Sequence, residues 1–339
     1  MEPELPSLND IHDAYHRIEK IINPTPVFTS RSLNRLTEAN LSFKCENFQR
    51  SGAFKFRGAC NALMRLTGNS PVTRVTTHSS GNHAGALALA ARLNHMQCIV
   101  VMPSNSSKIK VEAVREYGAR IVFCEPTLQS RETELERVVE QTGAYFIHPY
   151  NNIDVIAGQG TACLELIHDR ENMDCIVAPV GGGGLLSGTA IVAKSLNAKI
   201  RVYGAEPKEA DDAFRSVKAK KIIPSVNPQT IADGLLTSLS ERTFAAITRY
   251  VDDILTVSEQ GILEAMKLLW QRMKIVVEPS GCVPLAAILE HKQLFTGKKT
   301  GVILSGGNID PELFYRIQLQ FATNRRMIGK SNRVGFIHR

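Results

Sequence analysis

Short apolar runs rich in β-branched residues alternate with helix-like segments in the first half of the chain. Strands that alternate with helices in this rhythm predict βαβ units, and therefore a parallel sheet covered by helices. The expected strands are 74–78, 98–102, 120–124 and 144–148, and the helix-like segments between them are 81–95, 107–119 and 130–144.

A second series of the same kind begins at residue 175 and again predicts an α/β unit, without a repeat of solenoid period. Residues 207–235, which include Pro224 and Pro228, show neither the strand-like nor the helix-like pattern, and we expect them to be irregular. The expected strands are 175–180, 200–206, 252–257 and 301–304, and the expected helices are 184–196 and 259–273.

Polar or glycine-rich clusters follow three of the expected strands: HSSGN at 78–82, GGGG at 181–184 and SGGN at 305–308. Two α/β units usually bind a ligand between them, at the carboxyl ends of their strands. We therefore expect the three clusters to form one composite site.

The charge of the chain changes this picture little. A net charge of +7 on 339 residues could indicate nucleic-acid binding. However, residues 323–339 hold five Lys and Arg residues and no acid, and removing these five lowers the net charge from +7 to +2. We see no aromatic and basic platform for nucleic acid. We expect a solvated basic tail, with a polyanion or partner contact as the alternative.

Other features predict a cytosolic protein. The N-terminal stretch MEPELPSLNDIH is acidic and contains proline, unlike a signal or transit peptide, and no apolar run has membrane-spanning length. The seven cysteines are an odd number without a CxxC pair, so we expect buried free thiols rather than disulfides or a zinc site.

The glycine run 181–184 lies between an apolar strand and a helix, which predicts an anion site made by backbone N–H groups. A Walker loop is excluded because no Gly-Lys-Ser/Thr follows, and Leu186 or Ser187 stands where a dinucleotide fingerprint needs its third glycine. Glu206 ends the next strand, where a ribose-binding acid would lie, so a dinucleotide remains an alternative. A phosphorylated coenzyme such as pyridoxal phosphate fits better.

That coenzyme needs a lysine, and Lys55 has the least solvating neighbourhood in the sequence, SGAFKFRGA. A desolvated lysine near a second cation has a lowered pKa, and Arg57 supplies such a cation in sequence. The alternative is a surface lysine whose stem lies on apolar neighbours.

Four motifs, SGAFKFRGA, HSSGN, GGGG and SGGN, occur in the order found in the fold-type II pyridoxal-phosphate enzymes. In these motifs the chain resembles in particular the group of serine racemases and serine/threonine dehydratases. The resemblance extends from residue 25 to residue 308. It implies a tryptophan synthase β-like fold of two three-layer α/β domains with parallel-type sheets. The implied domains are a large coenzyme-binding domain (1–70 and 150–322), a small mobile domain (71–149) and the basic tail (323–339).

The resemblance also implies residue roles. Lys55 would bind the coenzyme, Phe54 would pack against it and Asn82 would contact its phenolic oxygen. The phosphate would lie on Gly181, Gly182, Gly183 and Gly184, and the ring nitrogen would meet Ser305. A hydroxyl cannot keep that nitrogen protonated as a carboxylate would, which favours reprotonation or loss of a β-hydroxyl over transamination. The substrate carboxylate would lie on Ser79, Ser80, Gly81, Asn82 and His83.

Inversion at Cα needs a proton removed from one face and returned to the other. Lys55 would serve one face and Ser80 the other, where many bacterial threonine dehydratases carry alanine. The alternative for Ser80 is capping of the following helix. The expected reaction is racemisation of serine with β-elimination to pyruvate and ammonia. The alternatives are an L-serine/L-threonine or hydroxyaspartate ammonia-lyase without racemisation, and a ligand-binding relative without activity.

The same resemblance places a divalent cation on Glu206, Ala210 and Asp212, two carboxylates and one backbone carbonyl. Such oxygen ligands suit Mg²⁺, with Ca²⁺ or Mn²⁺ as alternatives. ATP is a possible activator: Lys110 and Tyr117 of the related nucleotide site are retained, whereas Arg31, Ser32 and Tyr150 depart from the vertebrate pattern. A homodimer is implied, and we expect no regulatory domain after residue 320.

Overall fold

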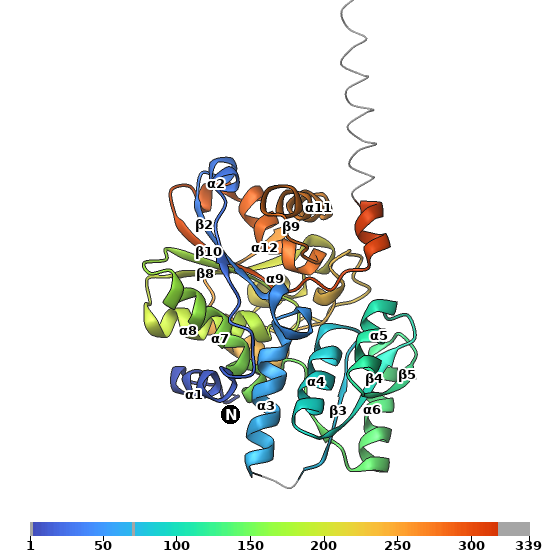
Figure 1. The fold of residues 1–339 in the computed structure, drawn as a ribbon. Coiled ribbons are helices and arrows are strands. Elements are labelled where there is room, and N and C mark those ends of the chain that lie inside the picture. Colours follow the sequence, from blue (N-terminus) through green and yellow to red (C-terminus); the bar gives the residue numbers. More distant parts are fainter. Residues whose placement is uncertain (1–2, 70–71, 318–339) are drawn as a thin grey trace, which may run out of the picture. The chain divides into compact units, whose positions relative to one another are not determined.

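The computed structural model describes residues 3–69 and 72–317. Met1–Asn308 form one compact unit, shown in Figure 1. A separate unit begins at Ile309, and its described part, residues 309–317, includes helical residues 311–317. The basic tail expected at 323–339 lies outside the described residues.

Two sheets organise the larger unit. The first has six strands in the order β1-β2-β10-β7-β8-β9, parallel except for β1, and the second has four parallel strands in the order β5-β4-β3-β6. The strands are β1 (Val27–Phe28), β2 (Asn40–Cys45), β3 (Arg74–His78), β4 (Gln97–Pro103), β5 (Arg120–Cys124), β6 (Tyr145–Phe146), β7 (Cys175–Pro179), β8 (Arg201–Pro207), β9 (Asp253–Val257) and β10 (Lys299–Leu304).

Helices cover both sheets, and α3 lies between α7 and α4, beside elements of each sheet (Figure 1). The helices are α1 (Leu8–Ile18), α2 (Arg31–Thr37), α3 (Lys55–Asn69), α4 (Asn82–Leu93), α5 (Lys108–Glu116), α6 (Leu128–Thr142), α7 (Ile153–Asp169), α8 (Gly184–Leu196), α9 (Asp212–Ala219), α10 (Glu241–Tyr250), α11 (Glu259–Leu268) and α12 (Pro279–Glu290).

The helices nearest the site are buried and rich in small residues. In α4 the alanine-rich sequence NHAGALALAARL buries most of its side chains against the four-stranded sheet, and the first ten residues of α8 are all buried. A Cβ on Gly158 of α7 would lie 2.6 Å from the Cα of Gly58 in α3, so glycine is required for this close contact. This packing sets the position of α3, whose first residue is Lys55.

Most expected elements are present, with three differences. Only Tyr145–Phe146 of the run 144–148 pair as a strand, and the segment 259–273 is α11 followed by the π-helical turn Leu269–Met273. The expectation that 207–235 is irregular was wrong in part, since it contains α9. Both oxygens of the Glu206 carboxylate accept N–H groups of the first turn of α9 at 2.9 Å, a tertiary cap that local sequence does not reveal.

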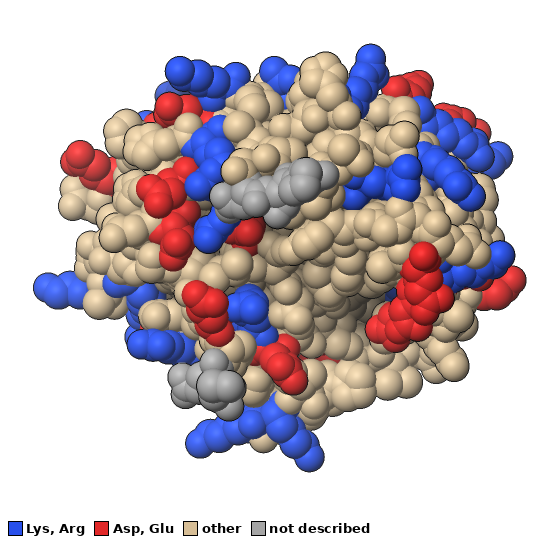
Figure 2. Space-filling view, turned by 90° about the horizontal axis from the view of Figure 1, so that it is seen from below, with Lys and Arg blue, Asp and Glu red and all other residues tan. Residues whose placement is uncertain are grey.

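All seven cysteines lie within the described residues, where they are buried and unpaired. No helix in the described parts of the chain combines the length and apolar character needed to cross a membrane. The four-stranded sheet lies within residues 74–146, while the division into a large and a small domain stays a prediction. On the face shown in Figure 2, basic and acidic side chains are interspersed around a hollow lined mainly by uncharged residues.

Candidate active site

Lys55 begins α3 with its amino group turned to another segment of the chain. Its Nζ donates to the carbonyl of Pro149 at 3.0 Å and lies 5.2 Å from the centre of the half-buried Phe54 ring. Burial lowers the pKa of Lys55 from 10.5 to about 8. Roughly a tenth of this lysine is therefore a free amine at pH 7, far more than at a pKa of 10.5, and the free amine is the nucleophile for an aldehyde.

Arg57 does not act as the second cation that the sequence suggested. Its guanidinium pairs with Glu46 and Glu165, and burial alone accounts for the lowered pKa of Lys55. The two cations of this segment thus differ in role: among residues 3–69 and 72–317 no acid pairs with Lys55, whereas Arg57 pairs with Glu46 and Glu165.

The segment after β10 holds the loop that leads to Lys55. Phe54 N–H donates to the carbonyl of Ser305 at 3.0 Å, and Gly307 N–H donates to the carbonyl of Gly52 at 2.9 Å. Ser305 is 3% exposed and directly follows β10. The structure therefore brings the lysine loop and the SGGN cluster together, with a buried hydroxyl at their junction.

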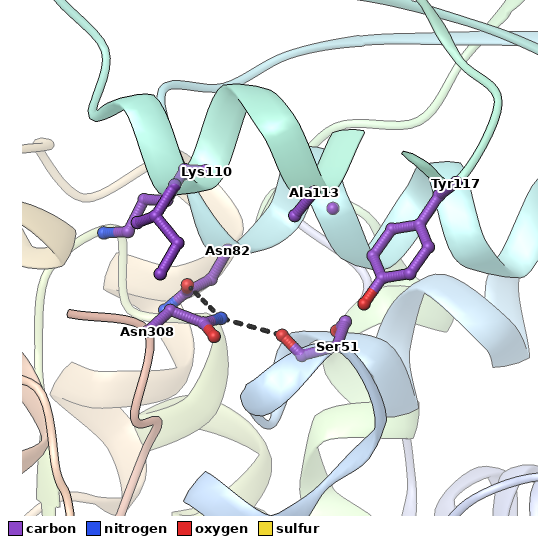
Figure 3. Close-up of a pocket in the computed structure, with 9 residues that line it drawn as sticks. Ser51, Asn82, Lys110, Ala113, Tyr117 and Asn308 are labelled. Carbon is purple, nitrogen blue, oxygen red and sulfur yellow. Dashed lines mark hydrogen bonds between the residues drawn. The ribbon is translucent and has the colours of Figure 1, made fainter. Parts of the chain in front are cut away.

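Asn82, the first residue of α4, joins three further segments (Figure 3). Its Nδ2 donates to Oε1 of Glu278 at 2.5 Å, and its Oδ1 accepts from Asn308 at 2.9 Å. Asn308 also donates to the carbonyl of Ser51 at 2.7 Å. The HSSGN cluster is thus connected to the SGGN cluster and to the lysine loop, which supports the expected composite site.

No separate role was assigned to Glu278 from sequence, and Asn308 was named only as the last residue of the SGGN cluster. Glu278 is 1% exposed, and burial raises its pKa to about 7 while Lys110, with its Nζ 3.6 Å away, lowers it. A lone glutamate in the apolar run IVVEPSG is a signal that could have pointed to it, since buried carboxylates need partners.

The remaining residues of the HSSGN cluster lie between β3 and α4. Ser79 N–H donates to the carbonyl of Val101 at 3.0 Å, and its hydroxyl accepts Gly81 N–H at 3.3 Å. Gly81 is the N-cap of α4 and no side chain caps this helix, so the capping alternative for Ser80 was wrong. Ser80 is half-buried in this loop.

His83 is buried in the first turn of α4, and neither ring nitrogen has a hydrogen-bond partner in good geometry among the described residues. Burial, and after it the charge of Lys55, lower its pKa well below the usual value. Nearby His148 likewise has its pKa lowered by burial, to about 3, and its Nδ1 accepts the N–H groups of Tyr150 and Asn151. The backbone of Ile147 is close enough to raise this pKa, so His83 has one neighbouring polar group but no hydrogen bond in good geometry within the described residues.

The glycine run 181–184 connects β7 to α8 and lies against Tyr150. A Cβ on Gly182 would be 2.4 Å from the Tyr150 ring, and a Cβ on Gly181 would be 2.9 Å from the Cα of Leu235. Gly183 is the N-cap residue of α8 and has a φ of +88°, and it has no side chain that could bond to the first N–H groups of the helix. The N-terminus of a long buried helix, free of side chains, fits a phosphate.

The expected metal ligands lie in three consecutive elements: Glu206 in β8, Ala210 in the turn after it and Asp212 at the start of α9. Glu206 and Asp212 are each 1% exposed, and Ala210 is buried between them in sequence. Burial raises the pKa of Glu206 to about 9 and that of Asp212 to about 7. Both carboxylate oxygens of Asp212 lack a partner in good geometry within the described part of the chain. The poorly satisfied carboxylate of Asp212, which also raises the pKa of Glu206, fits a hard cation.

A cavity of about 50 Å³ lies beside Asn82 (Figure 3). Its lining includes Lys110 and Tyr117, as the related nucleotide site implies, but not Arg31 or Ser32 of α2. The Lys110 amino group points away from the ring of Tyr117 and bonds to Asp233 at 2.5 Å. Its charge is therefore already compensated inside the chain.

Comparison with known proteins finds relatives over nearly the whole chain. Residues 18–306 match the family described as pyridoxal-phosphate dependent enzyme. A serine racemase from Dictyostelium discoideum is 49% identical over 308 residues, which cover 90% of this chain and 95% of the relative. A beta-hydroxyaspartate dehydratase from Paracoccus denitrificans is 48% identical over 306 residues, which cover 90% of this chain and 97% of the relative.

Solved structures give the same result. The structure of maize serine racemase superimposes with a TM-score of 0.90 at 41% sequence identity, covering 95% of this chain and 100% of the maize chain. The resemblance seen in four sequence motifs thus extends to the arrangement of the elements that carry them.

Proposed function

Since the chain belongs to the family of pyridoxal-phosphate dependent enzymes, we propose that it interconverts L-serine and D-serine and also converts serine to pyruvate and ammonia. The observation that carries this proposal is the 49% identity to a serine racemase over 90% of the chain. Ser80, in the loop between β3 and α4, supports it because a racemase needs a second proton-transfer group.

The coenzyme would be held by residues of four segments: the lysine loop, the start of α4, the glycine loop and the end of β10. Lys55 would carry it covalently, Phe54 would pack on its ring, and Asn82 would donate to its phenolic oxygen. Its phosphate would accept N–H groups of the glycine loop, Gly181 to Gly184, and its ring nitrogen would meet the hydroxyl of Ser305. Bound pyridoxal phosphate withdraws electrons from Cα of an attached amino acid and so acidifies the Cα proton.

Two side chains of this protein would then move the proton. The amino group of the substrate would first replace Nζ of Lys55 at the coenzyme, and the freed Nζ would then be a competent base, because burial lowers its pKa to about 8, close to the working pH. It would take the proton from one face of Cα, and Oγ of Ser80 would return one to the opposite face. The exchange of protons at Nζ and Oγ converts one enantiomer to the other.

The substrate carboxylate would bind where the chain offers unused polar groups. The loop Ser79–Ser80–Gly81 supplies hydroxyl and backbone donors, Asn82 would add its backbone N–H, and His83 a ring N–H, both from the first turn of α4. His83 supports this assignment, since its buried imidazole, without a hydrogen bond in good geometry among the described residues, gains one when the anion binds.

The test is to incubate the coenzyme-loaded protein with L-serine and to measure D-serine and pyruvate in the same samples. Formation of both products is expected. Pyruvate without D-serine would instead establish the ammonia-lyase, which the similarity to a hydroxyaspartate dehydratase makes the second candidate; L-threonine and L-threo-3-hydroxyaspartate are the comparison substrates. Neither product, with no visible absorbance from the coenzyme, would mean an inactive ligand-binding relative.

We also propose that Glu206, Asp212 and the carbonyl of Ala210 bind Mg²⁺, or Ca²⁺ or Mn²⁺ in its place. The two carboxylates are buried in a setting that raises both pKa values, and a cation would keep them ionised. The cation would organise the start of α9, because Glu206 also accepts the N–H groups of Ala213 and Phe214.

Three finer points complete the proposal. We expect ATP to change the initial rate little, because Lys110 is bonded to Asp233. Initial rates measured with and without Mg-ATP check this.

We propose a homodimer by similarity. The adjacent exposed rings of Phe28 and Phe48 support it, and light scattering checks it. The unpaired cysteines support a cytosolic location, which fractionation would test.

A further inference from the structure

Two carboxylates enclose the side chain of Arg57. Its Nε and Nη2 donate to Glu46 at 2.7 and 2.9 Å, and its Nη1 and Nη2 each donate to Glu165 at 2.7 Å. Nη1 also donates to the hydroxyl of Thr161 at 3.2 Å. All five N–H groups of the guanidinium therefore have acceptors, a planar forked geometry that lysine cannot reproduce.

Lys44 and Thr25 close this arrangement. Nζ of Lys44 donates to Glu165 at 2.5 Å and to the carbonyl of Thr25 at 2.7 Å, and the Thr25 hydroxyl donates to Glu46 at 2.5 Å. We call Lys44, Glu46, Arg57 and Glu165 the Arg57 cluster. It holds two cations and two carboxylates, so its charges balance.

The Arg57 cluster is deeply buried: Lys44, Glu46 and Arg57 are all 0% exposed. Buried ion pairs add little net stability compared with apolar side chains of the same shape, because desolvation of the charges offsets their attraction. Such a cluster does fix the relative orientation of the segments that it joins, since every hydrogen bond in it requires a particular geometry. We therefore ask which segments the cluster orients.

The cluster joins the end of β2, the first turn of α3 and the middle of α7. Lys55 and Arg57 are two residues apart on α3, which places them about 200° apart around the helix axis. Anchoring Arg57 against β2 and α7 therefore turns Lys55 to the opposite side, where its Nζ meets the carbonyl of Pro149.

Two levels of α3 restrain its rotation. The backbones of α3 and α7 meet at Gly58 and Gly158, where a Cβ on either residue would lie within 2.7 Å of the other helix, and this contact sets the distance between the helices. One turn further along, Asn61 donates to the carbonyl of Asp154 at 2.7 Å. In the first turn of α3 the forked bonds of Arg57 restrain the rotation, because they act at one angle only.

We propose that Arg57, through Glu46 and Glu165, is a positioning residue that fixes the rotation of α3 and thereby the direction in which Lys55 presents its amino group to the coenzyme. The inference rests on the proposed attachment of the coenzyme at Lys55. It does not depend on which amino acid is converted or on whether the product is D-serine or pyruvate.

Arg57→Lys tests this, since it keeps the charge and loses the fork. We expect the dissociation constant of the coenzyme, titrated by visible absorbance, to rise about tenfold, and the pH midpoint of that absorbance to move. We expect kcat to fall about 100-fold, as for a small misplacement of a reacting group, with KM nearly unchanged. Asp252→Asn is the matched control, because it breaks ion pairs with Lys194 and Arg201 that lie on α8 and β8.

Thermal unfolding of both variants separates orientation from stability. One outcome is that the Tm of Arg57→Lys falls below that of the parent by the same amount as the Tm of Asp252→Asn. If it does so while the coenzyme affinity and the pH midpoint stay at the parental values, the cluster is only structural and the proposal is wrong. If Arg57→Lys does not fold, Glu165→Gln decides, since it keeps the shape and weakens one fork; an unchanged coenzyme affinity there overturns the proposal. A parent protein that binds no coenzyme would overturn the proposed function instead.

Discussion

Nδ2 of Asn82 donates to Oε1 of Glu278 at 2.5 Å, which joins the start of α4 to the residue before α12. A carboxylate oxygen only accepts, and Asn308 donates to the other end of the Asn82 amide, so the orientation of that amide is fixed from both sides. The second N–H of Nδ2 remains for the phenolic oxygen of the coenzyme. Glu278 thus prepares Asn82 for the role that we propose.

Glu278→Gln should change the pH dependence of stability. Burial raises the pKa of Glu278 from 4.5 to about 7. Between these values the folded protein binds a proton that the unfolded chain has released, so the free energy of unfolding falls as the pH rises through this range. Glutamine does not titrate, and the fall should be smaller in the variant. Urea unfolding at pH 4.5, 5.5 and 7 measures this, and identical slopes in parent and variant would contradict it.

Much of the fold could be predicted from sequence because its signals are local. The run RIVFC is β5 and the segment GLLSGTAIVAKSL is α8, with the expected bounds. The α/β class and its relation to the fold-type II coenzyme enzymes are confirmed by the similar chains and structures. Helix α9 was missed because its cap is the carboxylate of Glu206, at the end of the preceding strand, rather than the residue at the N-cap position.

The site was predictable where its residues stand in continuous motifs, and not where single side chains meet across the chain. Glu278 lies 196 residues from Asn82, and Asn308 lies 257 residues from Ser51. Arg57 shows the opposite error, since sequence proximity suggested that it influences the pKa of Lys55, whereas Glu46 and Glu165 take up its charge. Partners across such separations are set by the tertiary fold.

Lys55→Ala should lower the rates of racemisation and of pyruvate formation by about 10³-fold or more, because the same amine attaches the coenzyme and transfers the Cα proton. The visible absorbance of the bound coenzyme should disappear as well. Borohydride reduction of the parent followed by peptide mapping should label Lys55. Labelling of a different lysine would remove the basis of the proposed mechanism.

Ser80→Ala should separate the two reactions. Without Oγ no group returns a proton to the second face, so racemisation should fall about 100-fold. Formation of pyruvate from L-serine should continue, since Lys55 still removes the proton on its own face. Chiral analysis of serine together with a pyruvate assay measures both. Racemisation at the parental rate would show that Ser80 is not the second proton-transfer group.

Asp212→Ala should abolish the response of the protein to chelation. In the parent, the proposed cation on Glu206 and Asp212 would stabilise the folded state by about 2.7 kcal/mol at a concentration 100 times its dissociation constant, and EDTA should lower the Tm accordingly. Asp211→Ala is the matched control, since Asp211 pairs with Arg215 at 2.6 Å instead. It should remain as sensitive to EDTA as the parent. An EDTA effect that persists in Asp212→Ala would place the cation elsewhere.

Gly183→Ala should weaken both stability and phosphate binding. With a φ of +88° the new side chain is strained by about 1–2 kcal/mol. Its Cβ would also lie 2.8 Å from side-chain carbons of Leu239 and Thr243, and such overpacking costs about 1–3 kcal/mol more. The loop must then shift, which moves the N–H groups at the start of α8 away from the phosphate.

Gly118→Ala isolates the packing part of this effect. Gly118 has nearly the same backbone angle, a φ of +85°, but a Cβ there meets nothing within 4 Å. Its substitution should cost only the backbone strain and leave coenzyme binding unchanged. Urea unfolding and coenzyme titration of the two variants give the difference, which we expect to be about 1–3 kcal/mol in stability. Equal losses in both variants would mean that the glycine at 183 serves its backbone angle alone, without a tight fit against α10.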